Sequence, residues 1–288
     1  MTNAPREWTV LSMMEWATDY FKERNIPDPR LSIEWLLAQT LDIKRLDLYL
    51  NFDRPLSADE LDRLRPLVKR RAQHEPLQYI VGFTEFMNAR IDVAPGVLIP
   101  RIETEQMVEI ILDRYENWEE FRVLDIGTGS GCIPIALKQE RPGWNISALD
   151  ISTEALNLAR RNAEQNDVEI NFFHADILDW KEFPTFDGPL DLIVSNPPYI
   201  LPEEKETLEP QVREYEPELA LFAPDLIKIY SSIRDFASVR LTSGGRVYLE
   251  LHELHASDIS ELFDEPKWNN DVRKDYNKKA RFLISEKR

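Results

Sequence analysis

The chain has 288 residues, of which 43% are hydrophobic and 30% charged, which is typical of a globular protein with one large domain or a large and a small one. No run approaches the roughly 20 apolar residues of a membrane-spanning helix, and the first ten residues lack the apolar core of a signal peptide. The single cysteine, Cys132, excludes a disulfide framework and a thiolate zinc site. These features predict a cytoplasmic protein. We also expect a monomer and no metal centre.

The charge is strongly acidic and unevenly distributed. The net charge is −17, yet the first 100 residues are nearly neutral, with 13 basic and 15 acidic residues, whereas the rest hold 22 basic and 37 acidic residues. A protein that binds nucleic acid needs a positive face, so we expect no direct contact with nucleic acid. The acidity indicates a solubility feature, with adaptation to a basic partner or a saline cell as alternatives.

The first eighty residues have the apolar spacing of helices. We expect helices over 8–24 and 31–41, and a third from the N-cap Ser57, with Glu60 completing a capping box, to about Ala72. The basic run 69–71 is either a solvated helix end or a contact with an acidic partner or RNA. The tryptophans at helical spacing are predicted to form the core of this small domain: Trp8, Trp16 and Trp35.

The pattern then changes twice along the chain. Residues 78–99 indicate short strands and a hairpin that connects two domains. After a helix over 103–118, strands and helices alternate to the end of the chain, which predicts an α/β domain with a mostly parallel sheet. The predicted organisation is a helical domain over 1–76, a hairpin linker over 77–101 and an α/β domain over 102–288.

A glycine-rich loop follows the first strand of that domain. The strand 121–126 runs into Gly127-Thr128-Gly129-Ser130-Gly131, and glycines at such a turn let the backbone approach a ligand closely. The next strand ends at Asp150, where a carboxylate can accept hydrogen bonds from ribose hydroxyls. A third strand ends near Asp176, placed to meet an adenine edge or to cap a helix. The G-x-G-x-G spacing differs from the G-x-G-x-x-G of dinucleotide folds, and NAD remains an alternative ligand.

The fourth strand, 190–195, ends in Asn196-Pro197-Pro198-Tyr199. Two prolines cannot continue a strand, so the chain must leave the sheet there as a stiff loop. The Asn196 side-chain carbonyl and the Pro197 backbone carbonyl can both accept hydrogen bonds from one NH₂ group, and Tyr199 can pack on a planar target. These residues would orient a weakly nucleophilic nitrogen towards a sulfonium methyl group. We predict no catalytic base.

The loop, the two acids and Asn196-Pro197-Pro198-Tyr199 resemble those of class I S-adenosylmethionine-dependent methyltransferases. Three further blocks, at 82–86, 98–105 and 212–217, are similar to those of HemK/PrmC-type release factor glutamine N5-methyltransferases. This resemblance implies a Rossmann-like domain with a helical domain that holds the protein substrate. It also implies transfer of a methyl group from S-adenosylmethionine to the glutamine of the Gly-Gly-Gln motif in peptide chain release factors, which modulates translation termination. The product would be S-adenosylhomocysteine.

The resemblance also implies site residues. Asp125 would lie near the amino group of the methionine moiety. The predicted cofactor-binding residues are Asp125, Gly127, Thr128, Gly129, Ser130, Gly131, Asp150, Asp176, Ile177 and Asn196. The predicted substrate-binding residues are Asn196, Pro197, Pro198 and Tyr199, with Asn196, Pro197 and Tyr199 catalytic. The chain departs from the family at Ile102, usually proline, at Ile177, often aromatic, and over 275–281.

Three alternatives remain open at this point. The acceptor could be a glutamine of a large-subunit ribosomal protein or adenine N6 in nucleic acid, or the chain could clamp a translation partner without catalysis. The pair His252 and His255 does not have the spacing of a metalloprotease, so we predict a loop or helix start there. Cys132 is predicted to be a small buried residue.

Overall fold

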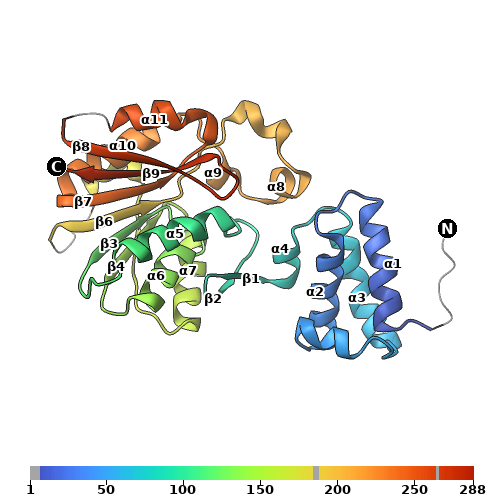
Figure 1. Cartoon of the computed structure of the whole chain (residues 1–288). Coiled ribbons are helices and arrows are strands. Elements are labelled where there is room, and N and C mark those ends of the chain that lie inside the picture. Colours follow the sequence, from blue (N-terminus) through green and yellow to red (C-terminus); the bar gives the residue numbers. More distant parts are fainter. Residues whose placement is uncertain (1–6, 184–187, 264–265) are drawn as a thin grey trace. The chain divides into compact units, whose positions relative to one another are not determined.

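The structure is a computed structural model that describes residues 7–183, 188–263 and 266–288. The chain forms two compact units, one over 1–82 together with 209–215 and the other over 83–208 together with 216–288 (Figure 1). The boundary between the units thus lies after Gly82, between the sequence-based boundaries after residues 76 and 101. A short segment from the second half of the chain also belongs to the first unit, which no local sequence pattern indicates.

The first unit is helical, as its apolar spacing predicts. Its helices are α1 (Val10–Lys22), α2 (Pro29–Leu41), a 3-10 helix (Arg45–Leu50), α3 (Ala58–Arg71), α4 (Leu77–Val81) and α8 (Pro210–Tyr215). The capping box at the start of α3 is confirmed: the Glu60 N–H donates to Ser57 Oγ at 3.3 Å and the Ser57 N–H donates to Glu60 Oε2 at 2.9 Å. The three tryptophans are only partly buried and pack against the edge of the core rather than forming its centre.

The basic run at the end of α3 is solvated only at its first residue. The Arg71 side chain is 2% exposed, and burial lowers its pKa to about 10 against the opposing charges of Asp28 and Glu209. Its guanidinium donates to Ser32 Oγ (3.0 Å), Pro27 O (3.0 Å), Glu75 O (2.9 Å) and Gln211 Oε1 (3.1 Å). Arg70 pairs with the Glu75 carboxylate. Only Lys69 is exposed, so both readings of this run are wrong for Arg71, which holds the first unit together.

The second unit begins with a hairpin, β1 (Phe83–Phe86) and β2 (Ala89–Asp92), which the sequence predicts. The main sheet consists of β3 (Arg122–Ile126), β4 (Asn145–Asp150), β5 (Asn171–His174), β6 (Leu190–Ser195), β7 (Leu241–Glu250), β8 (Trp268–Lys274) and β9 (Ala280–Lys287). Its helices are α5 (Ile102–Arg114), α6 (Cys132–Glu140), α7 (Thr153–Gln165), α9 (Glu218–Leu221), α10 (Leu226–Arg240) and α11 (Ala256–Leu262). Further 3-10 helices are Ile177–Glu182, Pro202–Thr207 and Glu253–His255.

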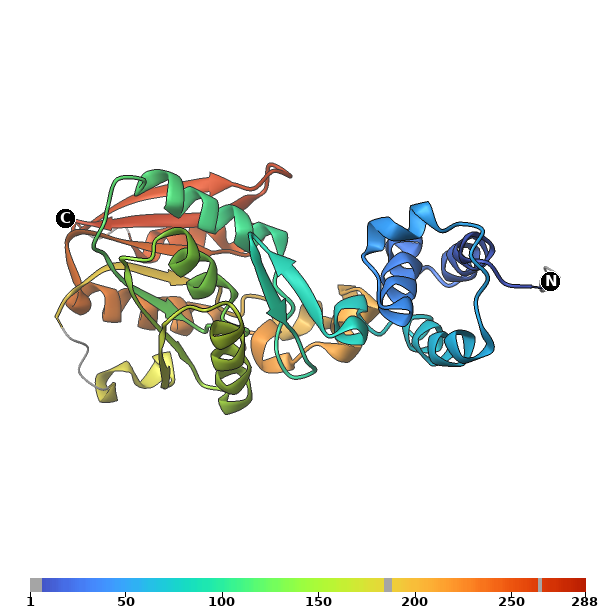
Figure 2. The ribbon, with the colours of Figure 1, turned by 90° about the horizontal axis from the view of Figure 1, so that it is seen from below.

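Among the described residues, the main sheet has the strand order β5-β4-β3-β6-β7-β9-β8. The strands from β5 to β7 are parallel to their neighbours, and β9 is antiparallel to both β7 and β8. Helices α5, α6 and α7 cover one face and α10 and α11 the other (Figures 1 and 2). From β3 the chain adds β4 and β5 on one side of the sheet and then β6 and β7 on the other. The strand order therefore reverses between β3 and β6, and open α/β sheets bind ligands at such a point, at the carboxyl ends of their strands.

Three expectations need correction. Residues 77–81 form the short helix α4 before the hairpin, and the helix predicted to reach Trp118 ends at Arg114. The strand–helix alternation does not continue to the end of the chain, because β8 and β9 pair directly as an antiparallel hairpin.

Within the described ranges, every helix is too short or too polar to cross a bilayer.

Candidate active site

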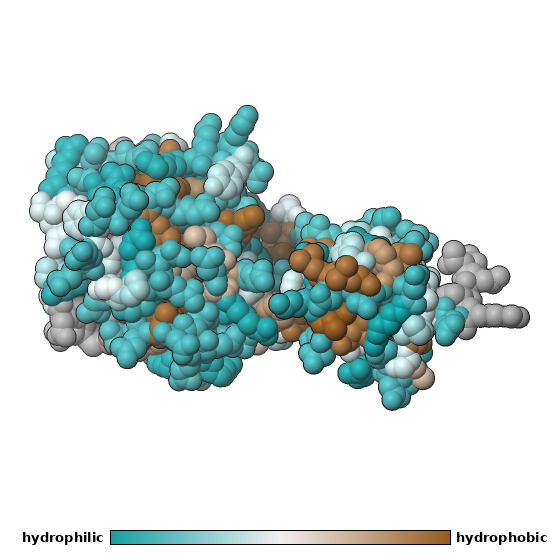
Figure 3. All heavy atoms as spheres, turned by 60° about the horizontal axis from the view of Figure 1, so that its bottom comes forward, coloured by the Kyte–Doolittle hydropathy of each residue, from teal (hydrophilic) through white to brown (hydrophobic). Residues whose placement is uncertain are grey.

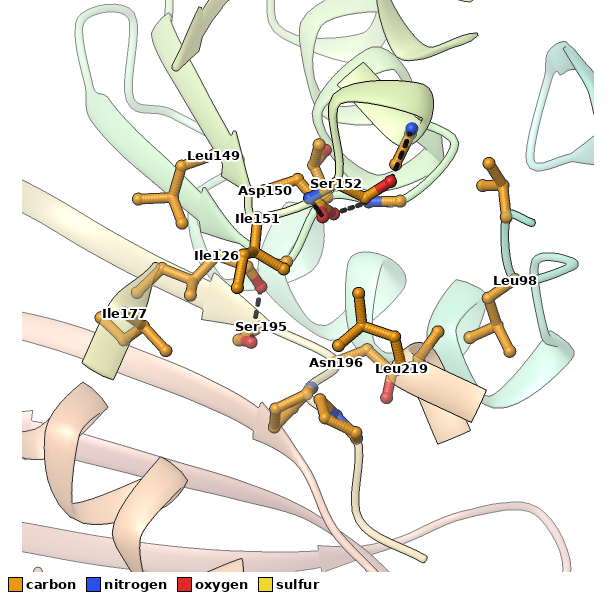
Figure 4. A pocket seen from close by; sticks show the side chains of 18 of the residues that line it. Leu98, Ile126, Leu149, Asp150, Ile151, Ser152, Ile177, Ser195, Asn196 and Leu219 are labelled. Carbon is orange, nitrogen blue, oxygen red and sulfur yellow. Dashed lines mark hydrogen bonds between the residues drawn. The ribbon is translucent and has the colours of Figure 1, made fainter. Parts of the chain in front are cut away.

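A cavity of about 370 Å³ opens at the carboxyl ends of β3, β4 and β6. Its walls come from the glycine-rich loop after β3, the ends of β4 and β5, and the segment after β6. In Figure 4, Leu149, Ile151 and Ile177 gather at one end of the cavity, and Leu98, Asn196 and Leu219 gather at the other. The site therefore has an apolar end beside β4 and an end that carries the Asn196 amide.

The glycine-rich loop is shaped by backbone conformation at all three glycines. Gly127, Gly129 and Gly131 have φ angles of 73°, 56° and 81°, in the left-handed region that L side chains rarely adopt. A Cβ at Gly127 would meet nothing within 4 Å, whereas one at Gly131 would lie 3.0 Å from the Ala159 Cβ on α7. Gly127 therefore leaves room for a ligand, and Gly131 allows the close packing of α6 on α7.

The Asp150 carboxylate is held at the end of β4 by two backbone donors. The Gly129 N–H donates to Oδ2 and the Ser152 N–H donates to Oδ1, both at 2.8 Å (Figure 4). Burial raises the pKa of Asp150, and these hydrogen bonds oppose that shift. Each oxygen keeps a lone pair for a further donor, so a pair of vicinal ribose hydroxyls fits this carboxylate.

Asp125, at the carboxyl end of β3, is fully buried. Both of its carboxylate oxygens and the Thr128 hydroxyl are without a hydrogen-bond partner among the described residues. Burial raises the pKa of Asp125 to about 7, with a smaller contribution from the Asp150 charge, while the nearby Thr128 hydroxyl opposes the shift. Asp125 is not among the residues that line the cavity, although its neighbours Ile126, Gly127 and Thr128 are. Buried polar groups normally have partners, and a buried carboxylate of this kind favours a cationic partner.

Asp176 acts as a helix cap. Its carboxylate accepts a hydrogen bond from the Leu178 N–H at 2.9 Å and begins the 3-10 helix Ile177–Glu182. Asp176, Ile177 and Leu178 all line the cavity. The prediction that Asp176 caps a helix is confirmed. Its contact with an adenine edge stays a prediction, and the position of Asp176 at the apolar end of the cavity allows it.

The segment after β6 turns into the cavity as the two prolines predict. The Ser195 hydroxyl donates to the Ile126 carbonyl at 2.6 Å and ties β6 to β3 (Figure 4). Asn196, Pro197 and Pro198 line the cavity. Tyr199 is not among the lining residues: its hydroxyl donates to Glu250 Oε1 at 2.9 Å, and burial raises its pKa. Packing of the Tyr199 ring on a target group stays a prediction.

Several residues of the site had no role assigned from the sequence. Thr104 on α5 accepts a hydrogen bond from Asn196 Nδ2 at 3.0 Å and donates to Glu250 Oε2 at 2.8 Å. Glu216 accepts from Arg101 Nη2 at 2.5 Å and from the Ile99 N–H at 3.2 Å. The family-like blocks 98–105 and 212–217 contain all three of these residues: Arg101, Thr104 and Glu216. The blocks could therefore have marked them as site residues, but no local pattern shows which residues pair with one another over such distances.

Two features remain without a role in the site: the histidine pair and the single cysteine. His252 caps the 3-10 helix Glu253–His255, and His255 is its last residue, so the predicted loop or helix start is confirmed. Within the described residues, no cluster of acidic, histidine and cysteine side chains could hold a metal ion. Cys132 is buried, and burial raises its pKa to about 12. A thiol of that pKa is not a nucleophile near neutral pH.

The sheet order and the cavity at its switch point define a class I S-adenosylmethionine-dependent methyltransferase fold. Two solved structures share this fold. A Pyrococcus furiosus methyltransferase is 18% identical, with 70% of this chain and 89% of that chain covered and a TM-score of 0.51. The Thermus thermophilus 16S rRNA N2 G1207 methyltransferase in complex with AdoMet and guanosine is 19% identical, with 72% of this chain and 50% of that chain covered and a TM-score of 0.51. At these identities the likeness concerns the fold alone.

Comparison of the sequence is more specific. Residues 12–82 match the PrmC N-terminal domain and residues 85–211 the methyltransferase small domain. The release factor glutamine methyltransferase of Chlorobaculum tepidum is 41% identical over 283 residues, 96% of each chain. That of Geobacter sulfurreducens is 41% identical over 264 residues, 91% of each chain. The chain belongs to the release factor glutamine methyltransferase family.

Proposed function

We propose that this chain transfers a methyl group from S-adenosylmethionine to the side-chain amide N5 of the glutamine in the Gly-Gly-Gln motif of a peptide chain release factor. Family membership supports the acceptor, since relatives that span nearly the whole chain are named release factor glutamine methyltransferases. The observation that carries the proposal is the placement of Asn196, Pro197 and Pro198 on the wall of the cavity at the sheet switch point. The remaining product would be S-adenosylhomocysteine.

The cavity suits S-adenosylmethionine, which supplies an electrophilic sulfonium methyl group when bound. The unpaired, buried Asp125 carboxylate and the nearby Thr128 hydroxyl fit a cationic amino group. Asp150 can accept from two ribose hydroxyls, and Ile151, Ile177 and Leu178 offer an apolar slot for a flat base. Gly127 and Gly129 let the loop backbone approach the ligand without a side chain between them.

Asn196 and Pro197 would hold the target amide. The nitrogen lone pair of an amide is delocalised, so such a nitrogen is a poor nucleophile and depends on orientation. Carbonyl groups of Asn196 and Pro197 can accept the two N–H bonds of one NH₂ group and aim the nitrogen at the methyl donor. The nitrogen becomes acidic as the new bond forms and can then release its proton, so this arrangement requires no general base.

The helical unit is the proposed site for the protein substrate. Figure 3 shows apolar residues gathered on one face of the helical unit. Large apolar side chains of this unit are exposed, among them Leu46 (70% exposed) and Leu50 (83% exposed). Exposed apolar surface of this kind is typical of protein-binding faces. We further expect a monomer that acts in the cytoplasm on release factors, without direct contact with nucleic acid.

The test is methyl transfer from radiolabelled S-adenosylmethionine to a purified release factor, with a Gln→Ala change in the Gly-Gly-Gln motif as the control acceptor. Label on the unchanged factor alone supports the proposal. Label on a ribosomal protein or on duplex DNA, with none on the release factor, refutes the proposed acceptor.

The same assay tests the role of Asn196. Asn196→Ala should lower the rate of methyl transfer roughly a hundredfold, the scale for losing one orienting group, while the affinity for S-adenosylmethionine stays within a few fold. Asn157→Ala, an exposed asparagine on α7, is the matched control and should be unchanged. Equal losses of cofactor affinity and rate in Asn196→Ala would contradict an orienting role.

A further inference from the structure

The Asn196 side chain is tied to two residues that lie far away in the sequence. Its Nδ2 donates to Thr104 Oγ1 at 3.0 Å across 92 residues of chain, and the Thr104 hydroxyl donates to Glu250 Oε2 at 2.8 Å across 146 residues. Thr104 and Glu250 are 2% and 1% exposed. The three side chains thus form a relay of hydrogen bonds from the end of β7 to the wall of the cavity, in which Thr104 and Glu250 are buried and Asn196 is half-buried.

The polarity of this relay fixes which end of the Asn196 amide faces the cavity. The two Glu250 carboxyl oxygens accept from the Tyr199 hydroxyl and from the Thr104 hydroxyl respectively, so the single hydroxyl proton of Thr104 points to Glu250. The lone pairs of the Thr104 oxygen are then left for a donor, and the only donor of an asparagine side chain is its NH₂ group. Asn196 Nδ2 must therefore face Thr104, and Oδ1, which accepts from no described residue, faces away from it.

We propose that Thr104 and Glu250 are positioning residues that keep the Asn196 carbonyl oxygen available to the NH₂ group of the target amide. Because an amide has nearly the same shape after a flip of O and N, shape alone does not select the orientation. A flipped Asn196 would present its own NH₂ group to the NH₂ group of the substrate, two donors facing each other. The inference rests on the function proposed above, in which Asn196 accepts from that group.

Glu250 is itself held in place from several sides. Its Oε1 accepts from the Tyr199 hydroxyl at 2.9 Å, and its backbone carbonyl accepts from the Tyr230 hydroxyl at 2.7 Å. Burial raises the pKa of Glu250, whereas the hydrogen bonds from Thr104 and Tyr199 and the positive charge of Arg281 oppose the shift. Arg281 is fixed beside it, since Nη1 donates to the Leu251 carbonyl at 3.0 Å and Nε pairs with Asp275.

The relay can be tested by removing one hydroxyl without changing the shape of its side chain. Thr104→Val should lower kcat for release factor methylation about tenfold, the scale of one lost hydrogen bond. KM for the release factor and the Kd for S-adenosylmethionine should stay within about twofold. Thr104→Ser, which restores the hydroxyl, should recover kcat to within about twofold of the unchanged enzyme.

A double-mutant cycle separates positioning from a merely structural role. In an Asn196→Ala background, Thr104→Val should cause no further loss of kcat, because the group that it positions is gone. An equal additional loss in that background, or a Thr104→Val enzyme with unchanged kcat, would overturn the inference.

Glu250→Gln provides a second variant. A glutamine side chain can donate a hydrogen bond to Thr104, so the Asn196 amide is no longer held in one orientation. We expect a several-fold loss of kcat, and unchanged kcat would overturn the inference as well.

The two levels of proposal fail differently. If the release factor is not an acceptor, the proposed function is wrong. If Asn196→Ala keeps full activity on the release factor, the orienting role of Asn196 and the relay are both wrong, while the proposed methyl transfer stands. If Asn196→Ala is impaired while the Thr104 and Glu250 variants are not, the proposed function stands and only the relay is refuted.

Discussion

The buried carboxyl group of Asp125 makes a prediction about the stability of the unliganded protein. Asp125 is 0% exposed and lacks a hydrogen-bond partner among the described residues. Burial raises its pKa from 3.8 to about 7. The perturbation is Asp125→Asn, which keeps the shape of the side chain and removes the ionisable group.

The magnitude follows from this difference in pKa. The folded chain keeps a proton on Asp125 up to about pH 7, whereas the unfolded chain releases it near pH 3.8. Retention of this proton contributes to the unfolding free energy. The contribution is fully present below pH 3.8, decreases as the pH rises above 3.8, and is lost once the pH has passed through about 7. A shift of about three pKa units corresponds to about 4 kcal/mol of unfolding free energy.

Denaturant unfolding between pH 4.5 and 8.5 measures this effect. The difference in unfolding free energy between Asp125→Asn and the unchanged protein should be small near pH 4.5 and grow to about 4 kcal/mol in favour of the variant above pH 7. Taking the difference removes the titration of groups that both proteins share. Asp113→Asn, an exposed aspartate at the end of α5, should show no such growth.

Cofactor binding should move in the opposite direction. At pH 8 the Asp125 carboxylate can pair with the amino group of S-adenosylmethionine, so Asp125→Asn should weaken binding at least tenfold, the scale of a lost charge-assisted hydrogen bond. A stability difference that does not change between pH 5 and 8 would refute the argument from burial. A variant with undiminished cofactor affinity would refute the assignment of Asp125 to the amino group.

Two further predictions concern the loop and the helical unit. Gly131→Ala should lower the unfolding free energy by about 1–3 kcal/mol and weaken cofactor binding, because its Cβ would lie 3.0 Å from the Ala159 Cβ at a φ of 81°; a calorimetric Tm and a Kd equal to those of the unchanged protein would contradict this. Leu50→Asp should raise KM for the release factor several-fold without changing the Kd for S-adenosylmethionine, whereas Val239→Asp, at a 63% exposed position on α10, should be neutral. An unchanged KM for Leu50→Asp would place the protein substrate elsewhere.

Much of the fold could be predicted from the sequence, because its signals are local. The capping box of Ser57 and Glu60 marks the start of α3 within four residues of chain. The run of strand, glycines and helix around Gly127 predicts β3, the loop and α6 in order. The sequence does not predict the hairpin of β8 and β9, since its polar outer strand lacks the apolar alternation on which strand prediction depends.

The sequence by itself determined the chemistry that the site carries: a glycine-rich turn, acids at the ends of successive strands, and Asn196 followed by two prolines. Each of these is a short motif whose residue types limit the backbone and the hydrogen bonds available to it. Only the tertiary structure decided what these residues touch. The orientation of Asn196 depends on Thr104 and Glu250. Thr104 lies 92 residues before Asn196, and Glu250 lies 146 residues after Thr104. Long-range pairs of this kind arise when the sheet order brings β6, β7 and α5 together, and no local periodicity records that order.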